Sequence, residues 1–105
     1  MSKEIITYYP YLLVRPIIVN DRVIKQIDIS SHCDKHLKHG ITHELIIELV
    51  KLLNKGDFEI DGQERNKLYF KNYYYDYENE NYKLVWWWWL DKDDYILRVR
   101  TCHPI

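Results

Sequence analysis

The chain has 105 residues, of which 47% are hydrophobic and 15% aromatic, and its formal net charge is -1. So much apolar material excludes a disordered chain, and the length fits one domain with a single modest core. Because nucleic-acid-binding proteins usually have a basic excess, the near-neutral charge disfavours that class unless positive side chains gather on one face.

The first 29 residues are rich in β-forming side chains and predict an N-terminal β-hairpin. Its first arm would be Tyr11–Val19, and its second arm would be Val23–Ile29, in which apolar and polar side chains alternate. Pro16 interrupts the first arm, and proline within strands is confined to edges and bulges because it cannot donate to the ladder. We therefore expect Tyr11–Val19 to be an edge strand or to contain a bulge.

Two short helices are expected next. The hydroxyl of Ser30 is a suitable N-cap for a helix over His32–His39, and Gly40 fits the left-handed position after its end. Thr42 would cap a second helix, His43–Leu53, whose apolar side chains recur every three or four residues along one stripe.

The remaining part of the chain predicts four strands and no further helix. The strands are Asp57–Ile60, Asn66–Tyr75, Tyr82–Leu90 and Tyr95–Cys102, with turn signals between them. Because helices and strands are segregated along the chain, we expect an α+β fold in which these four strands form an antiparallel sheet.

The last two of these strands would form a hairpin at the centre of the sheet. Alternation divides the second arm into a core face and an arginine face: Tyr95, Leu97, Val99 and Thr101 against Ile96, Arg98, Arg100 and Cys102. The tryptophan run divides in the same way: Trp86 and Trp88 against Trp87 and Trp89. We expect an active surface to use the face that carries the two arginines.

Three histidines lie in the expected first helix, and such a cluster is one possible metal site. His32 and His36 are four residues apart and share a helix face, with Cys33 beside them. His43 or His103 would be further ligands. The spacing matches no zinc-ligand pattern, so we expect no metal and no cofactor. The alternative is a polar helix face whose histidines form hydrogen bonds or contact water.

The same residue types suit metal-free cleavage of RNA. In that reaction the ribose 2′-hydroxyl attacks the adjacent phosphate, which requires a base, an acid and a positive charge beside the phosphorane. Histidine titrates near neutrality, and the planar fork of arginine binds phosphate oxygens. We expect the catalytic residues to be His32, Arg98, Arg100 and His103. For the two arginines the alternative is a solvated strand face paired with acidic side chains.

Aromatic side chains on the sheet could stack unpaired bases. The expected substrate-binding residues are His36, Lys71, Tyr73 and Trp88. For the tryptophans the alternative is burial in the core, which we expect for at least half of them.

The segment Ile29–Val50 resembles the helical half of the BrnT-like toxins and related families of unknown function, within the wider group of small bacterial RelE-like toxins. Those relatives carry a serine-histidine-alanine pattern with two arginines, ending in Gly-Ile-Thr, where their two helices begin. The matching residues here are Ser30, His32, Gly40, Ile41 and Thr42. Cys33 stands in place of the alanine. His36 and His39 replace the arginines, which weakens a phosphate-holding role or makes it pH-dependent.

The resemblance implies a single RelE-like domain over residues 1–105, with 1–29 as an N-terminal extension, 30–54 as the helical pair and 57–102 as the antiparallel sheet. It also implies a toxin-type endoribonuclease that cleaves mRNA or tRNA without a metal and is silenced by an antitoxin over its active face. The chain departs from that family in its N-terminal hairpin and in its lack of a basic excess.

The composition also supports a second interpretation, in which the chain is a non-catalytic interaction module of the immunity or adaptor kind. Aromatic anchors dominate protein interfaces, so an aromatic sheet face would be its binding surface. In either case we expect a cytoplasmic protein without a membrane segment or a signal peptide at Met1–Glu4. The two cysteines, Cys33 and Cys102, indicate free thiols in a reducing compartment. The oligomeric state stays open.

Overall fold

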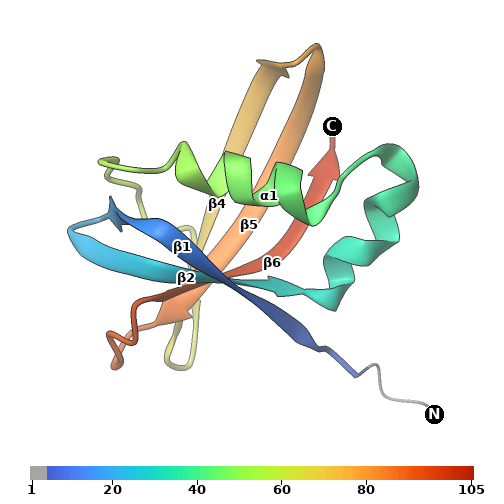
Figure 1. Ribbon diagram of the computed structural model, residues 1–105. Coiled ribbons are helices and arrows are strands. Elements are labelled where there is room, and N and C mark those ends of the chain that lie inside the picture. The colour runs from blue at the N-terminus through green and yellow to red at the C-terminus, as the bar shows by residue number, and fades with distance from the viewer. Residues whose placement is uncertain (1–4) are drawn as a thin grey trace.

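In the computed structural model, which describes residues 5–105, six strands form one mixed sheet in the order β1-β2-β6-β5-β4-β3. The strands are β1 (Tyr8–Val19), β2 (Arg22–Ser30), β3 (Gly62–Glu64), β4 (Lys67–Tyr77), β5 (Glu80–Trp89) and β6 (Ile96–Pro104). Between β2 and β3 lie a 3-10 helix, η1 (Ser31–His39), and an α-helix, α1 (His43–Lys51). Figure 1 shows α1 lying across one face of the sheet, with the β4–β5 hairpin extending beyond it.

The expectation of a four-stranded antiparallel, RelE-like sheet with a separate N-terminal hairpin is wrong. β2 pairs in parallel with β6, and Asp28 lies opposite Arg98 in the register. Residues 1–29 are therefore not an extension, because the part of them that the structure describes supplies two strands of the same sheet. The pairing buries Ile29 and Val99 on the same face, which is what stabilises the junction. The short strand expected over residues 57–60 is also displaced, since β3 begins at Gly62.

The predicted helix caps are confirmed. The Ser30 hydroxyl accepts a hydrogen bond from the backbone N–H of His32 at 3.2 Å, and the Thr42 hydroxyl accepts one from Leu45 at 3.2 Å. Gly40 has a φ of 79°, the left-handed conformation that glycine adopts without a Cβ penalty. The two hydroxyl caps fix where η1 and α1 begin, although η1 is a 3-10 helix and not an α-helix.

β1 is an edge strand with an irregularity, as Pro16 predicts. Its register against β2 shifts between Leu12 and Ile17, and Pro16 lies inside this interval. The end of β1 is held by the segment after α1: the Asn54 side chain accepts from the backbone N–H of Ile18 at 2.9 Å, and the carbonyl of Ile18 accepts from Lys55 at 2.6 Å. Because pairing of β1 with β2 is interrupted at Pro16, the backbone N–H that proline lacks is not needed for the ladder.

The core lies between α1 and the sheet and is centred on Trp86. This side chain is fully buried, stacks on Phe70 with ring centroids 4.2 Å apart, and donates from its indole nitrogen to the Asn72 side chain at 2.7 Å. The Tyr74 hydroxyl donates to the Leu49 carbonyl at 2.8 Å and so links β4 to α1. The expectation that the tryptophans alternate between two faces is met by the register of β5.

A β-bulge in β6 changes which side chains share a face. Val99 pairs with Trp86 and Thr101 with Val85, so Arg100 is an extra residue on β6. The expected alternation is therefore wrong beyond Val99. Cys102 is fully buried in the core instead of lying with the arginines, and Thr101 moves to the opposite face.

Both cysteines are free, as expected, and both are buried. Burial raises the pKa of each thiol, Cys33 and Cys102, to about 12. Within residues 5–105, none of the helices has the length and apolar character needed to cross a membrane. The expectation about a signal peptide concerns Met1–Glu4, which lie outside the described residues.

Candidate functional site

The sheet face opposite α1 carries an alternation of basic and aromatic side chains. Because Tyr74 and Trp86 point to α1, their neighbours along β4 and β5 point to the other face, here called the open face. The residues of the open face on the three strands are Lys67, Tyr69, Lys71, Tyr73 and Tyr75 of β4, Lys83, Val85, Trp87 and Trp89 of β5, and Arg98, Arg100, Thr101 and His103 of β6.

Trp87 forms a small packed cluster on the open face. It is only 3% exposed, because Tyr8 from β1 meets it edge-on at 6.3 Å and Lys67 lies over its ring at 4.6 Å. The Arg98 guanidinium lies 5.2 Å from the same ring centroid. Such cation–aromatic contacts contribute about 0.5–2 kcal/mol each, so the cluster holds β1 and β6 in place beside the site.

The Arg98 side chain forms an ion pair with Asp94. Its Nη2 lies 2.8 Å from Asp94 Oδ2, and its side chain is 13% exposed. The Nη1 atom has no hydrogen-bond partner and is buried against the tryptophan rings. The alternative considered for the arginines, an acidic partner, therefore holds for Arg98, which positions the β5–β6 turn instead of facing a substrate.

This ion pair predicts a pH-dependent stability. Burial acts to raise the pKa of Asp94, but the hydrogen bond and charge of Arg98 together with backbone N–H groups lower it below its ordinary value. The stabilisation is therefore present above the ordinary carboxyl pKa of about 3.9 and is lost as the pH falls through the lower folded-state pKa. Asp94→Asn should lower the urea midpoint at about pH 7 more than at about pH 2. An equal loss at both pH values would contradict the ion pair as its cause.

Arg100 lies at the border of two pockets of the open face. The smaller, the His32 pocket, has a volume of about 160 Å³ and is lined by Tyr8, His32, Glu64, Lys67, Tyr69 and Arg100. The larger, the His103 pocket, has a volume of about 470 Å³, and its lining includes Glu64, Tyr69, Lys71, Lys83, Arg100 and His103. The Arg100 guanidinium lies 5.5 Å from the ring centroid of Tyr69 and is exposed to solvent. His32 and His103, which are far apart in the sequence, thus each share a pocket with the exposed Arg100.

His103 is held in a cationic environment. Burial, Lys83 and His36 lower its pKa, in that order of size, so its imidazole is neutral near pH 7. Its Nδ1 lies 3.1 Å from the Thr101 hydroxyl, which orients the ring. A neutral imidazole beside an arginine suits a general base.

Some of the expected site residues come together and others do not. His32, Arg100, His103 and Lys71 line the two pockets, and Tyr73 lies beside them on β4. His36 lines neither pocket; its ring lies 5.8 Å from His103, and its Nδ1 is buried without a partner. The expectation for Trp88 is wrong, because this side chain is 3% exposed in the core on the α1 side and packs on Phe70.

The two pockets also contain polar and aromatic residues that we did not predict from the sequence, among them Tyr8, Glu64, Tyr69 and Lys83. The period-two alternation of β4 contained the signal for Tyr69, which follows Lys67 and precedes Lys71 on the same face. Lys83 could have been found from the same alternation in β5. Nothing in the local sequence indicates that Tyr8 reaches Trp87.

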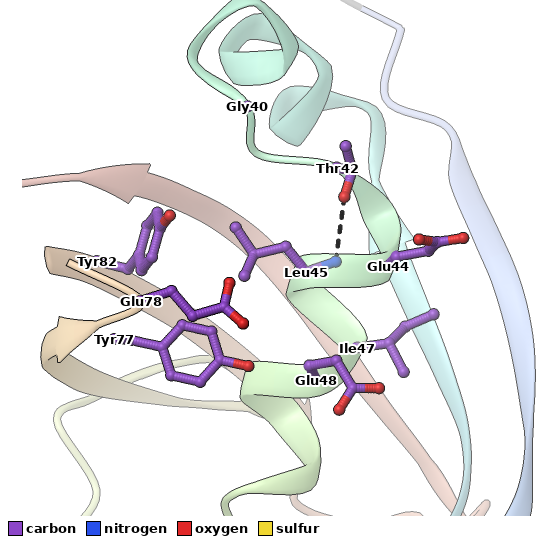
Figure 2. A pocket seen from close by; sticks show the side chains of 9 residues that line it. All are labelled: Gly40, Thr42, Glu44, Leu45, Ile47, Glu48, Tyr77, Glu78 and Tyr82. Atoms are coloured by element: carbon purple, nitrogen blue, oxygen red, sulfur yellow. Dashed lines mark hydrogen bonds between the residues drawn. The ribbon is translucent and has the colours of Figure 1, made fainter. Parts of the chain in front are cut away.

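A third pocket lies on the α1 side of the molecule and has the opposite charge. Its lining includes Glu44, Glu48 and Glu78, and Figure 2 shows Glu78 pointing from the β4–β5 hairpin toward α1. These glutamates disfavour a phosphate there, whereas the pockets of the open face contain Lys67, Lys83 and Arg100 beside the single shared carboxylate of Glu64, so we take the open face as the candidate site. Over residues 5–105, no three His, Cys, Asp or Glu side chains are grouped so that they could hold a metal ion. No family model, curated protein or solved structure matches the chain.

Proposed function

We propose that the chain is a metal-independent endoribonuclease that cleaves RNA at Arg100. The observation that carries this proposal is the position of Arg100 between the His32 pocket and the His103 pocket. A phosphodiester seated on Arg100 would have one imidazole on each side, which is the arrangement that an acid and a base need for transfer through phosphorus.

Each residue then has one role in a balanced reaction. His103, neutral near pH 7, takes the proton of the ribose 2′-hydroxyl as its oxygen bonds to phosphorus. The phosphorus–O5′ bond breaks, and His32 gives a proton to the leaving oxygen. Arg100 stabilises the charge that builds on the phosphorane oxygens. The products are a 2′,3′-cyclic phosphate and a free 5′-hydroxyl, and no water is consumed.

The local charge of the open face supports RNA as the ligand despite the net charge of the chain. Lys67, Lys83 and Arg100 project from adjacent strands, and each lies over an aromatic ring: Trp87, Tyr73 and Tyr69 respectively. A basic groove with aromatic rings is how single-stranded nucleic acid is bound without sequence selectivity. Lys71 adds less, because Asp61 pairs with it at 3.0 Å.

A toxin-type role on mRNA or tRNA in the cytoplasm, silenced by an antitoxin, is part of the same proposal. Its support is the motif match at Ser30, His32 and Gly40, together with the placement of His32 in a pocket of the open face. Expression of the chain alone should then slow growth, and expression of His103→Ala should not.

Cleavage of single-stranded RNA by the purified chain in excess EDTA tests the proposal. We expect His32→Ala and His103→Ala each to lower the rate by about 100-fold, as is typical for loss of an acid or base. His39→Ala is the matched control, since His39 is exposed and lines neither pocket. Because the pKa of His103 is lowered, activity should persist below the ordinary histidine pKa of about 6.5. Failure of the folded chain to cleave several RNAs, or loss of cleavage in EDTA, would contradict the proposal.

The second candidate, a non-catalytic interaction module, is favoured by one observation. β1 presents an apolar strip of Leu12, Val14 and Ile18, which are 79%, 99% and 47% exposed. Contiguous exposed apolar surface marks interaction sites. A folded chain that binds a protein partner through this strip and cleaves no RNA would establish the module instead.

A further inference from the structure

Two tyrosines near the end of β4 form a pair of parallel rings on the open face. The ring centroids of Tyr73 and Tyr75 are 6.4 Å apart and the ring planes differ by 10°. Both side chains are well exposed, 49% and 69%. Tyr74 between them points to the other face, where its hydroxyl donates to the Leu49 carbonyl and so anchors this segment of β4 to α1.

The spacing of these rings matches the space that a nucleobase occupies. Successive stacked bases lie about 3.4 Å apart, so a base between two parallel rings needs about twice that separation. The 6.4 Å between the centroids of Tyr73 and Tyr75 is close to this value. We propose that the two rings form a slot that takes one unpaired base of an RNA strand, an assignment that rests on the proposed nuclease function.

The surroundings of the slot favour a nucleotide over an apolar peptide side chain. Tyr73 pairs with Lys83 across β4 and β5, and Lys83 pairs with His103 across β5 and β6. The slot, the Lys83 ammonium and the proposed base His103 therefore lie in one row across the sheet. Since neighbouring strands are about 4.8 Å apart, the row spans about 10 Å from Tyr73 to His103. The Lys83 ammonium, 5.7 Å from the Tyr73 ring centroid, would meet the phosphate of the nucleotide in the slot.

The slot restricts the kind of RNA that the site can bind. A base can enter only if it is not already paired and stacked in a duplex, so the enzyme takes single-stranded RNA, loops or ends. Every base has a π-face, so the slot selects strandedness and not sequence. The slot would hold a nucleotide near the scissile phosphate, with the RNA strand running across β5 toward His103 and Arg100.

Binding of an uncleavable probe tests the slot apart from catalysis. The probe is a fluorescein-labelled oligoadenylate whose 2′-hydroxyls are methylated, which removes the attacking group. We expect Tyr73→Ala and Tyr75→Ala each to raise the Kd by about tenfold in fluorescence anisotropy, since stacking on one aromatic side chain is worth about 1–3 kcal/mol. Tyr73→Phe keeps the ring and should change the Kd by less than about twofold. Tyr9→Ala is the control, because Tyr9 is exposed but lies against His43 on the α1 side.

The outcomes separate the slot from the nuclease. Normal probe binding by both alanine variants, or equal binding of the probe and its duplex, would overturn the slot while leaving cleavage at Arg100 intact. Absence of probe binding by the folded chain would also overturn it, and the exposed pair would then belong to a protein-binding surface. The proposed nuclease function is judged separately by cleavage of unmodified RNA in EDTA, which needs no measurement on either tyrosine.

Discussion

Arg100→Ala is expected to lower the rate of RNA cleavage by about 100-fold or more, the usual loss when one group that stabilises transition-state charge is removed. Arg100 is an exposed, bulged residue whose guanidinium lies over Tyr69, and within residues 5–105 it has no ion pair comparable with that of Arg98. The variant should therefore keep its fold, with a stability loss of about 0.5–1 kcal/mol from the lost cation–aromatic contact. Single-turnover cleavage of a labelled single-stranded RNA measures the effect.

Two further variants make the result specific. Arg100→Lys keeps the charge but loses the planar fork that binds two phosphate oxygens, so its rate should lie between those of the wild type and the alanine variant. Arg15→Ala, at an exposed position of β1, removes the same charge far from the pockets and should leave the rate unchanged. Full activity of a folded Arg100→Ala variant would rule out this arginine as the phosphate-binding group.

Trp86→Ala is expected to lower the free energy of unfolding by about 3–5 kcal/mol, the range for removal of a buried aromatic side chain. Trp86 is fully buried, stacks on Phe70 at 4.2 Å and meets Phe58 edge-on at 5.9 Å. Its loss also leaves the Asn72 oxygen without the indole N–H at 2.7 Å. Because whole domains are stable by only about 5–15 kcal/mol, this variant should lose a large share of its stability and unfold at a clearly lower urea concentration.

Urea denaturation followed by circular dichroism measures this loss, and two variants locate its cause. Trp86→Phe keeps a stacked ring but removes the indole N–H, so it should lose less than the alanine variant. Trp89→Ala removes a partly exposed tryptophan of the same strand from the open face and should cost far less. A similar loss at both tryptophans would show that the core is not centred on Trp86.

Local sequence signals predicted the parts of the fold that depend on neighbouring residues. The caps at Ser30 and Thr42 and the left-handed Gly40 follow from the chemistry of single side chains. Strand periodicity located β4, β5 and β6 to within a few residues of their observed ends. Pairing between distant strands leaves no such local trace, so the parallel contact of β2 with β6 and the resulting single sheet could not be read from the pattern.

The candidate site shows the same limit at the level of single residues. Arg98 and Arg100 look equivalent in the sequence, but one is paired with Asp94 and the other is exposed at a bulge. No sequence pattern indicates the bulge at Arg100. The extra residue places Thr101 and Cys102 on the faces opposite to those that simple alternation predicts. The approach of His32 to Arg100 depends on the course of η1 over the sheet, which only the three-dimensional structure supplies.

The parallel junction of β2 and β6 has a consequence for how the chain acquires its structure. Gln26 pairs with Ile96, so the contact between β2 and β6 closes a long loop of the chain. The chain entropy lost in closing this loop opposes the contact until the pairing and packing of the strands stabilise it. During synthesis the β1–β2 hairpin leaves the ribosome before β6 and keeps one edge unpaired until β6 emerges. Arg100 and His103 belong to that last strand. The proposed nuclease centre is thus assembled in the same step that completes the sheet, so a nascent chain would hold no competent site until β6 has been made.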